Sequence, residues 1–451
     1  MSDPTPTHEG LVARICRLLA GHYNIAKMTI TLAAGAIGLL GIEKVLIIPI
    51  FVQYLGKDQT GQLLLAQAWM TTLLTCVGTG FSDSQMRLYK SAEDRSQGKQ
   101  LLGISIVLVM ALSFLLLLLA CGSYWLMKPA GWHIYLPLMI PMGLYALFQT
   151  MRPVLVLPYR VNLRFLPISG FDLLAGMLLL IALPLGLLWG PMAAGWGFAF
   201  AMFLAMALLL RSVRQYISLK QAPIRYWCGQ LLRTAPMFVP VALVTTAVYQ
   251  AARLTLGSFC TTSDVVAFFA MESVLGLMVM PLTYLSSVIY SMLSRKGQIH
   301  DIHRRSILQH VFTTLACAVL YAVAAVTLGP LVLKIMYRQP DLLDQISGPF
   351  KLMSVGVSFR VLSLFSRPFL FKFHKMRTVA ILPVITFTVL VTLLLVLVPH
   401  YGLWGAAWAV ACSNVVQGLI WFGPYLWLVL SHKQTLDKPA SPELQEEGVM
   451  S

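Results

Sequence analysis

The sequence predicts an all-α polytopic membrane protein, with about twelve transmembrane helices in two parallel six-helix lobes around a central cavity. Three observations predict this class: the composition, the spacing of long apolar runs and an internal repeat. Of 451 residues, 58% are hydrophobic and only 11% are charged, with a mean hydropathy of +0.77. Soluble domains are about a quarter charged. This composition excludes a soluble enzyme, and continuous apolar runs such as 115–119 exclude the alternating strands of a membrane β-barrel.

A helix needs about 20 apolar residues to cross the hydrocarbon layer. By this criterion we expect an N-lobe over 28–210, an inter-lobe linker over 211–234 and a C-lobe over 235–430. We expect cytoplasmic segments at 1–27 and 431–451, and no cleaved signal peptide at the N-terminus. The expected spans are 28–54, 62–81, 101–126, 134–158, 167–188, 194–210, 235–259, 265–292, 307–333, 348–371, 378–398 and 404–430.

The distribution of basic residues sets the predicted orientation. Segments on the side of the N-terminus hold 23 of the 33 Lys and Arg residues. The opposite loops hold 4, which are Lys57, Lys128, Lys334 and Arg338. By the positive-inside rule, both termini are predicted to face the cytoplasm. The net charge of +16 is then mainly an orientation signal, and its partners are anionic lipid headgroups rather than nucleic acid.

The sequence offers no motif for ATP hydrolysis, metal binding or covalent catalysis. The seven cysteines are scattered without a CxxC or Cys/His cluster, so we expect no metal site and no disulfide framework. Gly98-Lys99 is followed by Gln100 and lacks the glycine-rich run of a phosphate-binding loop. We therefore expect neither an enzyme nor a bound cofactor. A membrane polymerase or transferase is disfavoured because no long hydrophilic loop is available for catalytic groups.

Two motifs recur at a constant offset of 215 residues. Residues 152–155 (Arg-Pro-Val-Leu) match 367–370 (Arg-Pro-Phe-Leu), and 188–190 (Leu-Trp-Gly) match 403–405. Six spans per half is an even number, so both halves enter the membrane from the same side. The halves are thus predicted to be parallel repeats, an arrangement in which transporters bind substrate between the lobes and rock them alternately.

The segment 399–407 (Pro-His-Tyr-Gly-Leu-Trp-Gly-Ala-Ala), together with Tyr54-Leu55-Gly56 and Gly61, resembles the multidrug/oligosaccharidyl-lipid/polysaccharide exporter superfamily. The resemblance is to its polysaccharide branch, the Wzx-type flippases. It implies translocation of a polyprenyl-pyrophosphate-linked oligosaccharide across the bacterial inner membrane, for O-antigen, capsule or exopolysaccharide synthesis. It also implies a proton or sodium gradient as the driving force, and as partners the lipid-linked substrate, membrane lipids, a polysaccharide polymerase and a chain-length regulator. The alternative is a cation-coupled multidrug antiporter of the same superfamily.

Ionisable residues inside apolar spans are costly and therefore mark candidate functional groups. Five cations are predicted to bind an anionic headgroup, and three carboxylates are predicted to serve ion coupling. The cationic surplus favours a pyrophosphate lipid over an organic cation, because guanidinium matches phosphate oxygens. The cations are Lys44, Arg152, Arg253, Arg360 and Arg367, and the carboxylates are Glu43, Glu272 and Asp172.

Structural explanations stay open for each of these residues. Arg253 could instead form a buried ion pair with Glu272, and Arg360 has a similar alternative. Arg152 and Arg367 could snorkel to cytoplasmic headgroups. Glu43 and Lys44 could hold the lobes together through ion pairs, and Asp172 could pair with Arg164.

Overall fold

The computed structural model describes residues 27–35, 37–91, 95–127, 136–162, 164–218, 223–293, 304–373 and 376–431. Almost all of these residues are helical, and none lies in a strand. Most of the predicted cytoplasmic segments 1–27 and 431–451, and Lys128, lie outside this range. The helices are η1 (Ile37–Ile47), α2 (Ile48–Tyr54), α3 (Lys57–Ser91), α4 (Arg95–Met127), α5 (Leu136–Leu155), α6 (Leu157–Val161), α7 (Phe165–Leu179), α8 (Ala182–Val213), η3 (Arg214–Tyr216), α9 (Ile224–Phe259), α10 (Thr262–Leu293), α11 (Arg304–Met336), α12 (Pro340–Phe373) and α13 (Met376–Ser431).

The predicted all-helical membrane class is confirmed. Within the described residues, eight helical stretches are long and apolar enough to cross a membrane. The helices α9 and α12 are equally long but more polar, since they carry Arg253, Arg360 and Arg367. Each of the twelve predicted spans falls on helical residues wherever the structure describes them.

Two glycines break helices that would otherwise be too long for the bilayer. The 56 residues of α13 would extend about 84 Å at 1.5 Å per residue, against a hydrocarbon layer of about 30 Å. Gly402, with φ 53° and ψ −127°, interrupts α13, and Gly190, with φ 81° and ψ −173°, interrupts α8. Side chains are strongly disfavoured in these conformations. Each glycine therefore forms the turn between two successive spans.

These turns correct the expected repeat at one place. The offset of 215 pairs Gly190 with Gly405, but the turn of the C-lobe lies at Gly402, 212 residues after Gly190. At this offset Trp196 corresponds to Trp408. Gly405 instead lets two helices approach, because a Cβ there would lie 2.2 Å from the carbonyl oxygen of Leu397. The C-lobe is thus three residues shorter than the N-lobe between its Arg-Pro motif and this turn.

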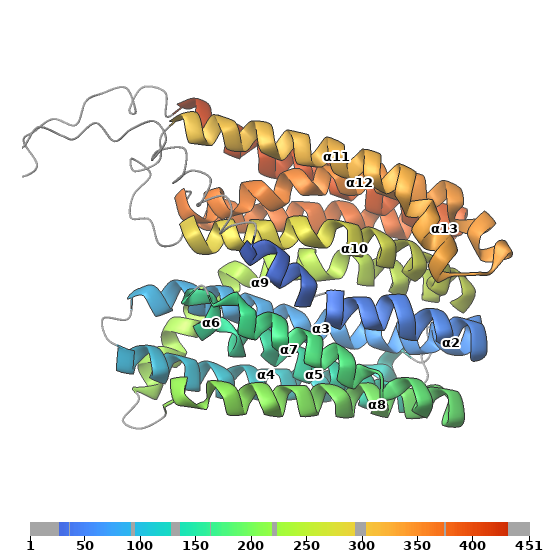
Figure 1. The fold of residues 1–451 in the computed structure, drawn as a ribbon, viewed down its shortest axis with the longest axis horizontal. Helices are drawn as coiled ribbons and strands as arrows, with labels where there is room; N and C mark the ends of the chain where they lie inside the picture. The colour runs from blue at the N-terminus through green and yellow to red at the C-terminus, as the bar shows by residue number, and fades with distance from the viewer. Residues whose placement is uncertain are drawn as a thin grey trace, which may run out of the picture.

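The helices form two bundles with roughly parallel axes (Figure 1). The N-lobe holds η1 to α8, and the C-lobe holds α10 to α13, with α9 packed against both α13 and α3. The antiparallel contact between α3 and the C-lobe uses small residues. A Cβ on Gly61 would lie 2.6 Å from the Thr262 carbonyl oxygen, and one on Gly80 would lie 2.7 Å from Val239. Close backbone approach of this kind is how helices associate in lipid.

The first span is irregular where its charges lie. Residues 37–47 adopt a π-helix, η1, which carries Glu43 and Lys44. One side of η1 is held against α7, since a Cβ on Gly176 would lie 2.0 Å from the Gly38 carbonyl oxygen. A π-helix is rare, and short π segments are frequent at functional sites.

Candidate functional site

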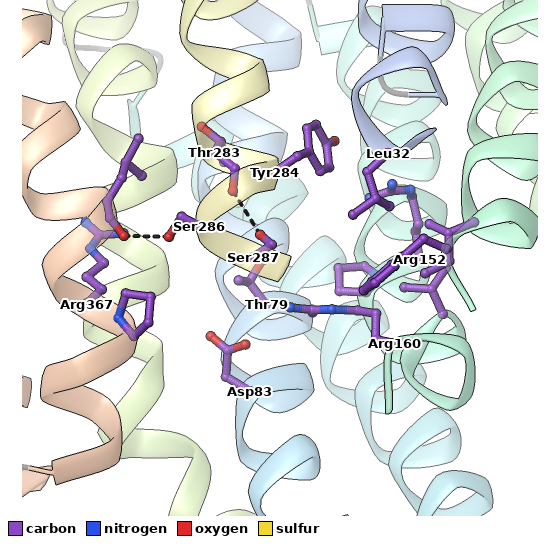
Figure 2. A pocket seen from close by; sticks show the side chains of 16 residues that line it. Leu32, Thr79, Asp83, Arg152, Arg160, Thr283, Tyr284, Ser286, Ser287 and Arg367 are labelled. Carbon is purple, nitrogen blue, oxygen red and sulfur yellow. Dashed lines mark hydrogen bonds between the residues drawn. The ribbon is translucent and has the colours of Figure 1, made fainter. Parts of the chain in front are cut away.

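A cavity of about 340 Å³ lies between the two lobes. Its walls come from α3, α5, α6 and α7 of the N-lobe and from α10 and α12 of the C-lobe. Polar groups face it from both sides (Figure 2), and they include three arginines and one carboxylate. These are Thr79, Asp83, Arg152, Arg160, Thr283, Tyr284, Ser286, Ser287 and Arg367. The cavity is thus a polar, net cationic space between two apolar bundles.

Arg152 is both a cavity residue and half of a buried ion pair. Its Nε donates to Asp172 Oδ1 at 2.6 Å, and a second nitrogen donates to Asp172 Oδ2. Asp172 is buried, whereas the Arg152 side chain stays 22% exposed. The expected alternative in which Asp172 pairs with Arg164 is wrong, because α7 turns the carboxylate toward α5. This bidentate pair fixes the guanidinium at the cavity wall.

The repeat-related Arg367 lines the opposite wall of the cavity. It lies 5.0 Å from the ring centre of Trp421, in a cation–π contact. Figure 2 shows Asp83 of α3 between Arg367 and Arg160, with Arg160 extending toward it. Asp83 is close enough to interact electrostatically with both arginines. One carboxylate therefore faces two guanidinium groups, which leaves positive charge available to a substrate.

A second group of charges links the lobes at the centre of the molecule. Lys44 Nζ of η1 donates to Glu272 Oε1 of α10 at 3.0 Å. Arg253 of α9 donates to the other oxygen, Glu272 Oε2, with Nε at 2.8 Å. Arg253 and Glu272 are only 2% and 4% exposed, and both cations lie near the Phe269 ring. Glu272 therefore bridges a cation from each lobe.

Glu43 follows Lys44's neighbour position in sequence but lies in different surroundings. It is buried, and it accepts hydrogen bonds from Gln67 Nε2 at 2.6 Å and from the Tyr145 hydroxyl at 2.9 Å. Within the described residues it forms no ion pair. The prediction of cross-lobe ion pairing therefore holds for Lys44 and fails for Glu43, because adjacent helical residues point about 100° apart.

Arg360 lies deeper in the C-lobe than the cavity. It is 9% exposed, and its guanidinium sits 5.3 Å from the ring centre of Tyr249. Its Nε has no hydrogen-bond partner, and no carboxylate among the described residues forms an ion pair with it. The expected ion-pairing alternative for Arg360 is therefore not realised.

The structure thus divides the eight predicted site residues into three places. Arg152, Asp172 and Arg367 belong to the cavity region, Lys44, Arg253 and Glu272 form the cross-lobe bridge, and Glu43 and Arg360 each occupy the interior of one lobe. Among the described residues, no three His, Cys, Asp or Glu side chains gather into a metal-binding cluster.

Sequence reasoning missed Asp83 and Arg160. Hydropathy ends the second span near residue 81 and the fourth near 158, which assigns both residues to cytoplasmic loops. In the structure α3 continues to Ser91, and α6 returns toward the cavity after a turn at Val156. The Pro153 that follows Arg152 was a usable signal, since proline interrupts helical hydrogen bonding and redirects the chain.

Comparison with known proteins gives structural matches only. Neither the known family profiles nor the curated protein sequences match this chain. A mutant of the Vibrio cholerae MATE transporter VcmN superposes with a TM-score of 0.67 at 15% identity, covering 91% of this chain and 97% of that one. An outward-facing multidrug resistance MATE family transporter of the MOP superfamily gives 0.69 at 14% identity, covering 91% and 97%.

A third match carries a description that concerns its pocket. It is a MOP superfamily transporter from Pyrococcus furiosus, for which a reversed polarity of the binding pocket is said to suggest a different function. It superposes with a TM-score of 0.70 at 14% identity, covering 92% of this chain and 97% of that one. At these identities the likeness establishes architecture and not substrate. This chain has the two-lobed helical fold of the MATE transporters of the MOP superfamily.

Proposed function

We propose that this protein is an alternating-access membrane transporter whose substrate carries an anionic headgroup between the two lobes. The observation that carries the proposal is the cavity charge: Arg152, Arg160 and Arg367 line it with Asp83 as the sole lining carboxylate among the described residues. Even when Asp172 is counted as the partner of Arg152, one positive charge remains. Guanidinium groups are well suited to phosphate oxygens, and hydroxyl groups from α10 suit sugars.

The substrate that fits these features, and the sequence resemblance, is a polyprenyl-pyrophosphate-linked oligosaccharide. Its pyrophosphate would contact the arginines, its sugars would contact Thr283, Ser287 and Tyr284, and its prenyl chain would remain in the bilayer. Under this proposal the protein is a Wzx-type flippase of the bacterial inner membrane, with both termini in the cytoplasm. A polysaccharide polymerase and a chain-length regulator would then act on the flipped product.

The second candidate is a cation-coupled multidrug antiporter. The solved structures that share the fold include multidrug resistance transporters, so the comparisons alone back this alternative better than the flippase. The arginines in the cavity oppose it, since an organic cation would meet like charge. The Pyrococcus furiosus transporter, with its reversed pocket polarity, is a precedent for a MOP superfamily member with a different function.

Transport requires a driving force, and we propose Glu43 as the coupling residue. It is a buried carboxylate within a π-helix, held by two hydrogen-bond donors and no cation. Such a group can take up and release a proton or a sodium ion without breaking an ion pair. Asp172 and Glu272, the other predicted coupling residues, each hold guanidinium groups and are assigned to structure.

A transport assay with two substrates separates the candidates. Proteoliposomes would be supplied either with a fluorescent undecaprenyl-pyrophosphate oligosaccharide or with a fluorescent organic cation. We expect flipping of the lipid to fall at least tenfold in Arg160→Gln and Arg367→Gln, with Arg211→Gln, an exposed arginine at the end of α8, as the matched control. Transport of the organic cation by the wild type, without flipping of the lipid, would establish the antiporter instead.

Orientation is tested separately by cysteine labelling. Ser96 is exposed near the start of α4, on the side predicted to face the cytoplasm. In a background without native cysteines, Ser96→Cys should react with an impermeant thiol reagent only in inverted vesicles. Labelling of the same variant from the periplasmic side would reverse the proposed topology.

A further inference from the structure

The interior of the C-lobe contains a buried guanidinium surrounded by unsatisfied hydrogen-bonding groups. Arg360 of α12 and Tyr249 of α9 are each 9% exposed, and Asn414 of α13 is fully buried. The Arg360 Nε, the Tyr249 hydroxyl and both polar atoms of the Asn414 amide lack a hydrogen bond of normal geometry. Buried polar groups in native proteins are rarely left unpaired, so a cluster of them calls for a missing partner.

These groups lie together. The Arg360 guanidinium is 5.3 Å from the Tyr249 ring centre. The Tyr249 hydroxyl is close enough to Arg360 and Asn414 to interact with both. Gln417, one helical turn after Asn414, is 1% exposed, and its amide is also unsatisfied. Residues three apart share a helix face, so α13 presents two free amides on the side that carries Asn414.

The charge balance identifies the sign of the missing partner. The described charges buried at the centre are Lys44, Arg253 and Arg360 against Glu272 and Glu43. With both carboxylates ionised one positive charge is left over, and Arg360 is the cation without a carboxylate. The contact with the Tyr249 ring offsets only part of the cost of burying it. An anion would remove the imbalance.

The donors identify its size and type. A guanidinium, a phenolic hydroxyl and carboxamide N–H groups can all donate hydrogen bonds, and none of them is a carboxylate. We propose that the C-lobe binds a small monovalent inorganic anion, of the size of chloride, between Arg360, Tyr249 and Asn414. The site is separate from the interlobe cavity, which Arg360 does not line. It does not depend on which substrate the transporter carries.

The test is thermal stability of the purified full-length protein in sodium gluconate, with bromide or chloride replacing gluconate at constant ionic strength. Gluconate is too large for the site. We expect a saturable rise in melting temperature of roughly 3–5 °C for the wild type. Arg360→Gln should lose the rise, Asn414→Leu should need at least tenfold more halide, and Arg211→Gln should behave as the wild type does.

Two further measurements make the test decisive. Crystals grown in bromide should show an anomalous peak beside Arg360, which settles the matter even if Arg360→Gln does not fold. Inorganic pyrophosphate in gluconate separates the site from a headgroup site. If pyrophosphate raises the melting temperature through Arg360 and halide does not, the site binds substrate phosphate and the proposal is wrong. An equal halide response in wild type and Arg360→Gln, or no peak, also overturns it.

Discussion

The centres of the two lobes have opposite chemistry, although the lobes are repeats. In the N-lobe, Tyr145 of α5 donates a hydrogen bond to a carboxylate on the first span, Glu43. In the C-lobe, the residue 215 positions after Tyr145 is Arg360, and it lies over a tyrosine on the seventh span, Tyr249. The same helix pair thus holds an acid and a tyrosine in one lobe, and a cation and a tyrosine in the other.

The cavity arginines differ between the lobes in a similar way. Arg152 and Arg367 precede prolines at equivalent positions, and both line the cavity. Arg152 is neutralised by Asp172. The corresponding stretch of the C-lobe, 384–387, is Val-Ile-Thr-Phe and offers no carboxylate. Duplication therefore preserved the geometry of the two walls, while divergence left the C-lobe with the excess positive charge.

The largest expected effect breaks the contact that joins the two lobes. Glu272→Gln leaves Lys44 and Arg253 without a counter-charge at a buried site. We expect a loss of stability of about 3–5 kcal/mol, as for other buried pairs from which one partner is removed. Detergent melting temperature measures it. The double variant Glu272→Gln with Arg253→Met should recover part of the loss, and failure to do so would show that the bridge is not the source of stability.

The next effect is expected in one lobe only. Asp172→Asn removes the carboxylate that holds Arg152, and we expect a loss of about 3 kcal/mol. Arg152 is partly exposed to the cavity, which limits the loss to the low end of that range. Its C-lobe counterpart, Arg367→Gln, removes a cation that has no bidentate carboxylate and should cost less than half as much. Equal losses in the two variants would remove the asymmetry between the lobes.

The turns should respond alike, because here the lobes are equivalent. Gly190→Ala and Gly402→Ala each place a side chain in a backbone region that glycine alone occupies readily. We expect each to cost about 1–3 kcal/mol. Gly170→Ala is the control, since a Cβ there would meet nothing within 4 Å and its φ is not positive. A control loss as large as the other two would contradict the assignment of the turns.

The smallest effect on stability should accompany the largest effect on coupling. Glu43→Gln retains an oxygen that can accept the Tyr145 hydrogen bond and strands no cation. We therefore expect a stability change below about 1 kcal/mol. Transport in proteoliposomes should lose its dependence on the proton or sodium gradient. A stable variant that still transports with the wild-type gradient dependence would exclude Glu43 from coupling.

Much of the fold was predictable because it follows from burial of long apolar segments. The expected spans fall on helices, and the Arg-Pro repeat correctly placed Arg152 and Arg367 on facing walls of one cavity. The pairing of the charges was not predictable to the same degree. Arg253 had Glu272 as a named alternative partner, but the assignment of Asp172 to Arg164 was wrong, and Asp83 and Arg160 were not identified at all.

The sequence by itself determined the membrane class, the two-lobed repeat and the cationic surplus, because hydropathy, motif spacing and charge counts are properties of the chain alone. The tertiary structure decided which charges are neutralised and which remain available. That choice depends on how each helix is rotated about its axis, and on how far helices such as α3 and α6 extend beyond their apolar residues. A rotation of about 100° separates Glu43, which has no cation beside it, from Lys44, which bridges the lobes.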